Sequence, residues 1–149
     1  MHQYPEAEIT VSIAASDAEI LSCFPVMVQL RPHLVEAEFV SRVRRQIRDA
    51  GYVLLYLEAN HVVRSLAGFR ISECLYSGKY LYVDDLATDA DSRSKGFGGI
   101  LFKWMVEHAR KNNCEVLTLD SGVQRFGAHR FYLAKGMNIT CHHFSLSLG

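Results

Sequence analysis

One stretch of the chain restricts the fold more than any other: a glycine-rich turn between a strand pattern and a helix pattern. Residues 80–86 (YLYVDDL) are typical of a strand, and residues 96–99 (GFGG) lead into residues 100–109, where apolar side chains recur at helical spacing. A short apolar segment follows at residues 116–119. Parallel strands joined through a helix form a right-handed crossover. This part of the chain therefore predicts a strand, a helix and a second, parallel strand.

The other patterns predict antiparallel strands and further helices. Pro25 and Pro32 interrupt the apolar stretch after Ser16, so the first helix is expected to break or to end in a loop near residues 30–33. Further strands are expected at residues 9–13, 52–57, 62–71 and 139–148, and further helices at residues 35–50 and 125–135. The predicted fold class is α/β, or α+β by a stricter definition. Its mixed, mostly antiparallel central sheet has flanking helices and one parallel strand-helix-strand crossover.

Length and charge limit the number of domains and the class of partner. The chain has 149 residues, which predicts a single domain over residues 1–149. Sixteen Lys and Arg residues balance sixteen Asp and Glu residues, so no overall field attracts a polyanion. Four arginines fall within two helical turns, but acidic residues flank them, which favours a solvated helix face. They are Arg42, Arg44, Arg45 and Arg48. We therefore expect no nucleic-acid partner.

Targeting and cysteine patterns favour a cytoplasmic protein. Residues 1–7 lack the basic and apolar regions of a secretory signal, and no apolar run approaches the ~20 residues of a membrane-spanning helix. The four cysteines form no CxxC pair, so we expect buried free thiols in a reducing compartment. They are Cys23, Cys74, Cys114 and Cys141. His142 and His143 are adjacent on an expected strand and would face opposite ways, so no metal is expected.

The glycine-rich turn has the properties of an anion site. A helix N-terminus exposes backbone N–H groups and the positive end of the helix dipole. Arg93 and Lys95 add positive charge, and the glycines of residues 96–99 let a diphosphate approach the backbone. The spacing of a P-loop is absent, and Leu101 stands where a dinucleotide fingerprint needs a small residue. The phosphate ligand is therefore of another kind.

Residues 93–98 (RSKGFG), after a strand and at the start of a helix, resemble the signature of the GNAT superfamily, the acyl-CoA-dependent N-acyltransferases. That signature is Gln or Arg, two residues, Gly, one residue, and Gly or Ala. Residues 80–88 (YLYVDDLAT) resemble the family's fourth strand, residues 67–69 its third strand, and residues 128–137 (AHRFYLAKGM) its late helix. The resemblance covers about residues 9–148. It implies the GNAT fold with acetyl-CoA as cosubstrate.

The resemblance also implies which residues bind acetyl-CoA. Backbone groups at the end of the strand would bind the pantetheine arm, and the glycine-rich turn would bind the pyrophosphate. The implied pantetheine residues are Leu86, Ala87 and Thr88, and the implied pyrophosphate residues are Arg93, Ser94, Lys95, Gly96, Phe97, Gly98 and Gly99. Many members place an Asn after the fifth strand to hold the pantetheine region, whereas this chain has Asp120, Ser121 and Gly122 there. Ser121 is expected to replace that contact in part.

Catalysis requires an acid and a base. By the resemblance, Tyr132 is the general acid at the sulfur, and a phenol with an ordinary pKa of ~10 suits the protonation of a thiolate. An amine acceptor must lose a proton, and Asp84 or Asp85 is expected to remove it. Successive strand residues face opposite ways, so only one of the pair is expected to reach a given cleft, with Tyr82 sharing the face of Asp84. His33, in the proline-bounded loop, is a weaker candidate for a base or an acceptor contact.

Two functions follow from these residues. The first is an enzyme that moves an acetyl group from acetyl-CoA directly to a primary amine of a small molecule or a protein, in a ternary complex. The second is a non-catalytic acyl-CoA-binding or regulatory module. The acceptor stays open, although the acidic strand favours a cation. Phe144, Leu146 and Leu148 on the expected final strand could pair with the edge of a second copy, giving a homodimer, and no membrane partner is expected.

Overall fold

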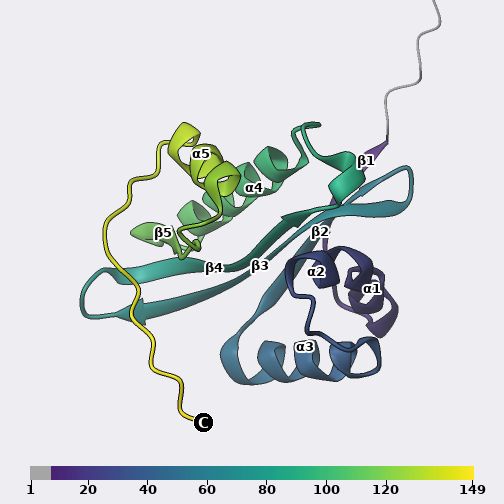
Figure 1. The fold of residues 1–149 in the computed structure, drawn as a ribbon, viewed down its shortest axis with the longest axis horizontal. Helices are drawn as coiled ribbons and strands as arrows, with labels where there is room; N and C mark the ends of the chain where they lie inside the picture. The colour runs from purple at the N-terminus through teal and green to yellow at the C-terminus, as the bar shows by residue number, and fades with distance from the viewer. Residues whose placement is uncertain (1–7) are drawn as a thin grey trace, which may run out of the picture. The chain divides into compact units, whose positions relative to one another are not determined.

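A computed structural model describes residues 8–149, so the polar segment 1–7 lies outside the described residues. The described helices and strands are, in chain order (Figure 1), β1 (Ile9–Ile13), α1 (Asp17–Ser22), α2 (Phe24–Leu30), α3 (Glu36–Ala50), β2 (Val53–Ala59), β3 (Val62–Cys74), β4 (Gly78–Thr88), the 3-10 turn η1 (Ala90–Ser92), α4 (Phe97–Lys111), β5 (Val116–Leu119) and α5 (Phe126–Ala134). They divide into two compact units, Met1–Thr118 and Leu119–Gly149.

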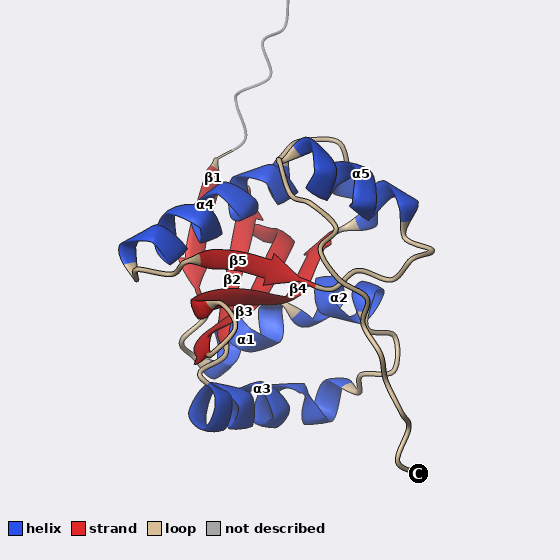
Figure 2. Ribbon diagram, turned by 90° about the vertical axis from the view of Figure 1, so that its left-hand side faces the viewer, coloured by secondary structure: helices blue, strands red, loops and turns tan. Residues whose placement is uncertain are grey.

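The first unit is built on one sheet with the strand order β1-β2-β3-β4-β5. Strands β1 to β4 pair antiparallel, and β4 and β5 are parallel neighbours joined through α4. Figure 2 shows α4 on one face of the sheet and α3 on the other. Phe69 of β3 packs against Trp104 and His108 of α4, with ring centroids 6.0 and 5.4 Å away. The predicted fold class, including the single parallel crossover, is confirmed.

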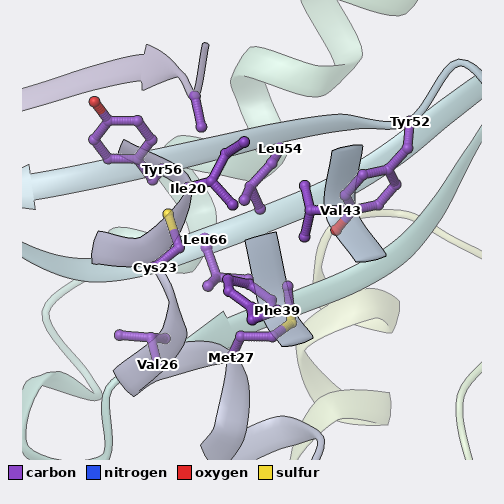
Figure 3. Close-up of a cluster of buried hydrophobic side chains, with 11 residues drawn as sticks. Ile20, Cys23, Val26, Met27, Phe39, Val43, Tyr52, Leu54, Tyr56 and Leu66 are labelled. Atoms are coloured by element: carbon purple, nitrogen blue, oxygen red, sulfur yellow. The ribbon is translucent and has the colours of Figure 1, made fainter. Parts of the chain in front are cut away.

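The helices on the second face of the sheet enclose a hydrophobic core. Side chains from α1, α2 and α3 meet those of β2 and β3 there (Figure 3). The buried members are Ala14, Ile20, Cys23, Val26, Met27, Phe39, Val43, Tyr52, Leu54, Tyr56 and Leu66. Burial of such side chains stabilises a fold by roughly 25 cal/mol per Å² of apolar surface. This core fixes α2 and α3 against the part of the sheet that carries the candidate site.

The first helical segment breaks where its sequence predicts. The side chain of Ser16 accepts a hydrogen bond from the backbone N–H of Glu19, and the Glu19 carboxylate accepts one from the backbone of Ser16, which forms a capping box. Helix α1 ends at Ser22, and Pro25 lies in the first turn of α2, where its missing N–H costs nothing. Helix α2 ends at Leu30, before Pro32, so the predicted loop is confirmed.

The arginines of α3 do not form one solvated row. Arg44 pairs with Asp17 of α1 (2.7 Å), and Arg48 pairs with its neighbour Asp49 (2.8 Å). Arg45 is exposed. Arg42 is half-buried and lines a pocket described below. The predicted solvated face is therefore correct for Arg44, Arg45 and Arg48, whereas Arg42 lies at the pocket.

The second unit consists of α5 and the residues around it. The prediction of a strand at residues 139–148, in this unit, is wrong. Those residues form no helix or strand, and Phe144 is 90% exposed. A strand needs a neighbour that pairs with its backbone N–H and C=O groups, and an alternating sequence does not supply one. In the same segment, Nδ1 of His143 lies 3.2 Å from Oδ2 of Asp120, the residue after β5.

The four cysteines are free, but their environments differ from the prediction. Cys23 is buried, and burial raises the pKa of its thiol to about 12, as expected for inert packing. The prediction of a buried thiol is wrong for Cys74 and Cys141, which are exposed. Cys74 ends β3 at a hairpin, and Cys141 lies in the segment without a strand. Among residues 8–149, no helix is long and apolar enough to cross a membrane, and no group of three His, Cys, Asp or Glu side chains could hold a metal ion.

Candidate active site

A β-bulge in β4 determines where the two candidate base residues point. Asp85 pairs with Gly68 of β3, whereas Val83 pairs with Phe69, so Asp84 is the extra residue on its strand. The bulge shifts the alternation of side chains by one residue. Tyr82 consequently shares its face with Asp85, and Asp84 and Asp85 line the same pocket. The prediction that only one aspartate reaches a given cleft is therefore wrong, because it assumed a regular strand.

Asp84 is held by an arginine of the neighbouring strand. The Nε and Nη2 atoms of Arg70 donate to the two carboxylate oxygens of Asp84 at 2.8 and 2.9 Å. The Arg70 guanidinium also lies 5.4 Å from the ring centroid of Tyr82. A bidentate pair of this kind is geometrically specific and compensates the carboxylate charge. The side chain of Asp84 is therefore held in place, and its negative charge is balanced by Arg70.

Asp85 is held by two residues from different elements. Arg31, which follows α2, donates from Nε to Oδ1 of Asp85 (3.1 Å) and from Nη2 to the backbone oxygen of Asp84 (2.8 Å). The hydroxyl of Tyr52, the residue before β2, donates to Oδ2 of Asp85 (2.8 Å). Burial and the neighbouring carboxylate raise the pKa of Tyr52 well above its ordinary value, so its hydroxyl stays protonated and donates. These contacts attach the bulge to both α2 and β2.

A pocket of about 340 Å³ opens between α2, α3 and the sheet. Its volume lies near the lower end of the roughly 300–1,000 Å³ of small-molecule sites. The lining combines apolar, acidic and basic side chains. It consists of Met27, Arg31, His33, Leu34, Phe39, Arg42, Val43, Gln46, Tyr52, Asp84 and Asp85. The weaker candidate His33 is thus brought together with both predicted base residues, from a loop more than 50 positions away in sequence.

Gly68 makes room for Tyr52 beside Asp85. A Cβ atom at Gly68 would collide with the hydroxyl end of the buried Tyr52 ring. We expect Gly68→Ala to lower the free energy of unfolding by about 1–3 kcal/mol, as overpacking does, measured by urea denaturation. The matched control is Gly127→Ala in α5, where an added Cβ meets nothing within 4 Å. Equal stabilities of the two variants would contradict this account of Gly68.

The predicted pyrophosphate residues lie where β4 leads into α4. Gly96 precedes α4 with a φ of +81°, a left-handed conformation that favours glycine. The start of α4 has no side-chain cap and no acidic residue in its first turn. Arg93, Ser94 and Lys95 are exposed beside it. The first-turn N–H groups therefore have no competing carboxylate on their own helix, which is the arrangement an anion requires.

The predicted pantetheine residues lie at the end of β4, beyond the reach of β5. The backbone N–H of Glu115 donates to the carbonyl of Lys79 (2.7 Å), so the four-residue strand β5 starts beside the first part of β4. Four residues span roughly 13 Å, too little to run along Leu86–Thr88. On its other side this segment pairs with β3, and the Ser65 hydroxyl donates to the Ala87 carbonyl (2.9 Å).

Two predicted residues belong to the second unit. Tyr132 lies in α5 and is partly buried, and its ring packs edge-on against Phe131 at 5.6 Å. Burial raises the pKa of Tyr132 above its ordinary value of 10.0, although Arg125 opposes this shift. Ser121 lies between β5 and α5 and is half-buried.

Comparison with known proteins identifies the family. The model of the acetyltransferase (GNAT) family matches residues 18–137. The chain is also 34% identical over 120 residues to the uncharacterized N-acetyltransferase YhdJ of Bacillus subtilis (strain 168), covering 80% of this chain and 84% of that protein. The chain belongs to the GNAT acetyltransferase family. It is an acyltransferase, which favours the enzyme over the non-catalytic acyl-CoA-binding or regulatory module.

Solved structures of GNAT proteins share the fold. A GNAT family acetyltransferase of Staphylococcus aureus superimposes with a TM-score of 0.79 at 19% identity, covering 94% of this chain and 98% of that one. AAC(6')-Iy, in complex with a bisubstrate analog of CoA and acetylneamine, superimposes with a TM-score of 0.81 at 12% identity, covering 95% of this chain and 99% of that one. At these identities the likeness concerns the fold alone.

Sequence reasoning missed three residues that organise the site of this GNAT protein. Arg31, Tyr52 and Arg70 hold the bulged part of β4, and none of them was a candidate. Arg70 could have been found, because a hairpin between the two strands places it across from Tyr82. Arg31 and Tyr52 carry no such signal, since their contacts with Asp85 span 54 and 33 residues.

Proposed function

We propose that this GNAT protein transfers an acetyl group from acetyl-CoA directly to a primary amine of a small molecule or a protein, in a ternary complex. The observation that carries this proposal is the start of α4, where Gly96 adopts a left-handed conformation and no side chain caps the helix. Such an N-terminus is suited to a diphosphate. The CoA analog in the structure of AAC(6')-Iy supports the same cosubstrate here.

Two segments would bind different parts of acetyl-CoA in this proposal, the glycine-rich turn and the end of β4. We propose that the pyrophosphate lies on residues 93–99, with Arg93 and Lys95 supplying full charges. The amides of pantetheine would pair with the backbone of Leu86–Thr88. This backbone is open on that side because β5 is too short to pair with it. Ser121 would add a hydroxyl contact to the same arm. No metal takes part in this proposal.

The proposed reaction balances one bond formed against one bond broken. The amine nitrogen bonds to the acetyl carbon, and the bond from that carbon to the CoA sulfur breaks. The protonated amine loses two protons in all: Asp85, directly or through a water molecule, takes the one whose removal frees the nitrogen lone pair, and the second leaves the nitrogen for water as the amide forms. The thiolate gains one proton from Tyr132, so the complete reaction releases one proton to water. Both side chains then return to their starting states by exchanging protons with water.

Asp85 is favoured over Asp84 as the base because of how each is held. Both oxygens of Asp84 are taken by the single guanidinium of Arg70. Asp85 has one oxygen on Arg31, and the other accepts from the neutral hydroxyl of Tyr52. A carboxylate with one charged and one neutral donor is less completely compensated. We therefore assign positioning of the bulge to Asp84 and proton removal to Asp85.

The wider setting of the enzyme is also a proposal. The family model runs from residue 18 to residue 137 and so includes parts of both compact units, which supports one acetyltransferase domain over residues 1–149. A cytoplasmic location and a homodimer stay predictions. For the homodimer, the exposed side chains of Phe144, Leu146 and Leu148 are the surface that a second copy would cover.

The first test is calorimetric titration with acetyl-CoA, followed by thiol release on adding primary amines. We expect micromolar binding, and we expect Gly98→Glu to weaken it by on the order of 100-fold, because a carboxylate beside a diphosphate costs several kcal/mol. The matched control is Ser41→Glu, which adds the same charge at an exposed position of α3. An absence of heat with acetyl-CoA, or equal binding by the two variants, would overturn the cosubstrate site.

A further inference from the structure

We propose that the amine acceptor of this enzyme carries an anionic group, a carboxylate or a phosphate, and that Arg42 binds this group in the pocket between α2, α3 and β4. The inference rests on the proposed function, because it names the substrate class of the same site. It replaces the expectation of a cationic acceptor, which came from the acidic strand alone.

The aspartates of the pocket do not leave free negative charge for a cation. Asp84 forms a bidentate pair with Arg70, and Asp85 forms an ion pair with Arg31. Their side chains are 26% and 14% exposed. Each carboxylate is thus matched by one guanidinium. A polycationic amine would gain little from either and would be repelled by the arginines around them.

Arg42 also lines the pocket, and it takes part in neither of these ion pairs. It is half-buried, yet within residues 8–149 no carboxylate lies at ion-pair distance from it and no hydrogen bond engages its side chain. The neighbouring arginines of α3 differ, since Arg44 and Arg48 both pair with aspartates at the surface. The pocket is therefore positive overall once its pairs are counted.

Arg42 lies at the edge of the apolar stripe of α3, where the helix borders the pocket. The residues of α3 that line the pocket are Phe39, Arg42, Val43 and Gln46, at relative positions 0, 3, 4 and 7. The stripe of α3 that packs into the core consists of Phe39, Val40, Val43 and Ile47, and Arg42 lies beside this stripe. An arginine that lines the pocket from this edge can offer its planar guanidinium to a carboxylate or phosphate in a bidentate manner.

The remaining lining describes the rest of the acceptor. Met27, Leu34, Phe39 and Val43 give an apolar wall, and Asp85 lies on the strand across from α3. The volume of about 340 Å³ fits a small molecule. The acceptor that matches this lining is a small amine with a short apolar skeleton between its amino group and its anionic group.

The test compares matched amines in the thiol-release assay with acetyl-CoA. The pairs are leucine against leucinamide and O-phosphoethanolamine against ethanolamine, with spermidine as the polycation. We expect at least one anionic member to exceed its neutral counterpart at least tenfold in kcat/KM, and the pair that does so distinguishes carboxylate from phosphate. Arg42→Gln should reduce that preference at least tenfold, mainly through KM. Arg45→Gln, at an exposed position of the same helix, is the matched control.

Direct binding separates this inference from the proposed function. Each amine is titrated calorimetrically into the enzyme loaded with CoA. Binding of an anionic amine that Arg42→Gln loses, without turnover of any amine, would sustain the anion site and overturn the catalytic proposal. Turnover of leucinamide, ethanolamine or spermidine with no preference for an anionic partner would overturn the anion site and sustain the catalytic proposal. Neither binding nor turnover would overturn both.

Discussion

Replacing Tyr132 with phenylalanine is expected to lower kcat by about 10²- to 10⁴-fold, the contribution of a well-placed general acid. Burial raises the pKa of the Tyr132 hydroxyl, so the phenol stays protonated at neutral pH and is ready to donate. The substitution removes one oxygen and keeps the ring that packs against Phe131. The measurement is kcat for thiol release, with acetyl-CoA binding followed separately by calorimetry.

The pH dependence gives this prediction a second readout. A raised pKa means that the wild-type acid loses its proton only above the ordinary value of about 10, so no loss of activity through Tyr132 is expected between pH 7 and 9. The control is Phe131→Leu, which disturbs the packing beside Tyr132 and leaves the hydroxyl in place. Loss of acetyl-CoA binding in Tyr132→Phe, or a kcat equal to that of the wild type, would assign this side chain to structure alone.

Local patterns in the sequence predicted most of the fold. The alternation at residues 9–13, the helical stripe after residue 99 and the prolines at 25 and 32 each report a backbone preference that needs no distant partner. The crossover through α4 followed from strand order and handedness. Positions of this kind tolerate errors of a few residues, and β3 and β4 are indeed longer than predicted.

The failures have a common physical cause, which is that they depend on partners far away in sequence. The bulge at Asp84 is a property of the pairing between β3 and β4 and not of the segment YVDDL itself. The strand expected at residues 139–148 has suitable side chains but no neighbour to pair with. The sequence alone could not distinguish Arg42 from Arg44 and Arg48, because the difference is that Arg44 and Arg48 form ion pairs with aspartates and Arg42 lines the pocket.

Asp85→Asn is expected to lower kcat/KM at pH 7 by about 10²- to 10⁴-fold, because an amide cannot accept the proton of the amine. The variant should regain activity as the pH rises. Below the ordinary amine pKa of ~10.4, each pH unit increases the neutral fraction of the acceptor about tenfold, and a neutral amine needs no base. The wild-type profile should be flatter over the same range, since Asp85 removes the proton there.

Two other variants separate proton removal from positioning. Asp84→Asn disrupts the pair with Arg70 but leaves Asp85 in place, and Tyr52→Phe removes one donor to Asp85 but keeps its carboxylate. Both should lose less activity than Asp85→Asn, and neither should acquire its steep rise with pH. If Asp84→Asn shows that rise instead, the base is Asp84. If all three variants keep the wild-type profile at reduced rates, both aspartates only hold the bulge. Because Arg31 binds Asp85 and the backbone of Asp84 together, a purely structural role would then extend to the whole connection between α2 and β4.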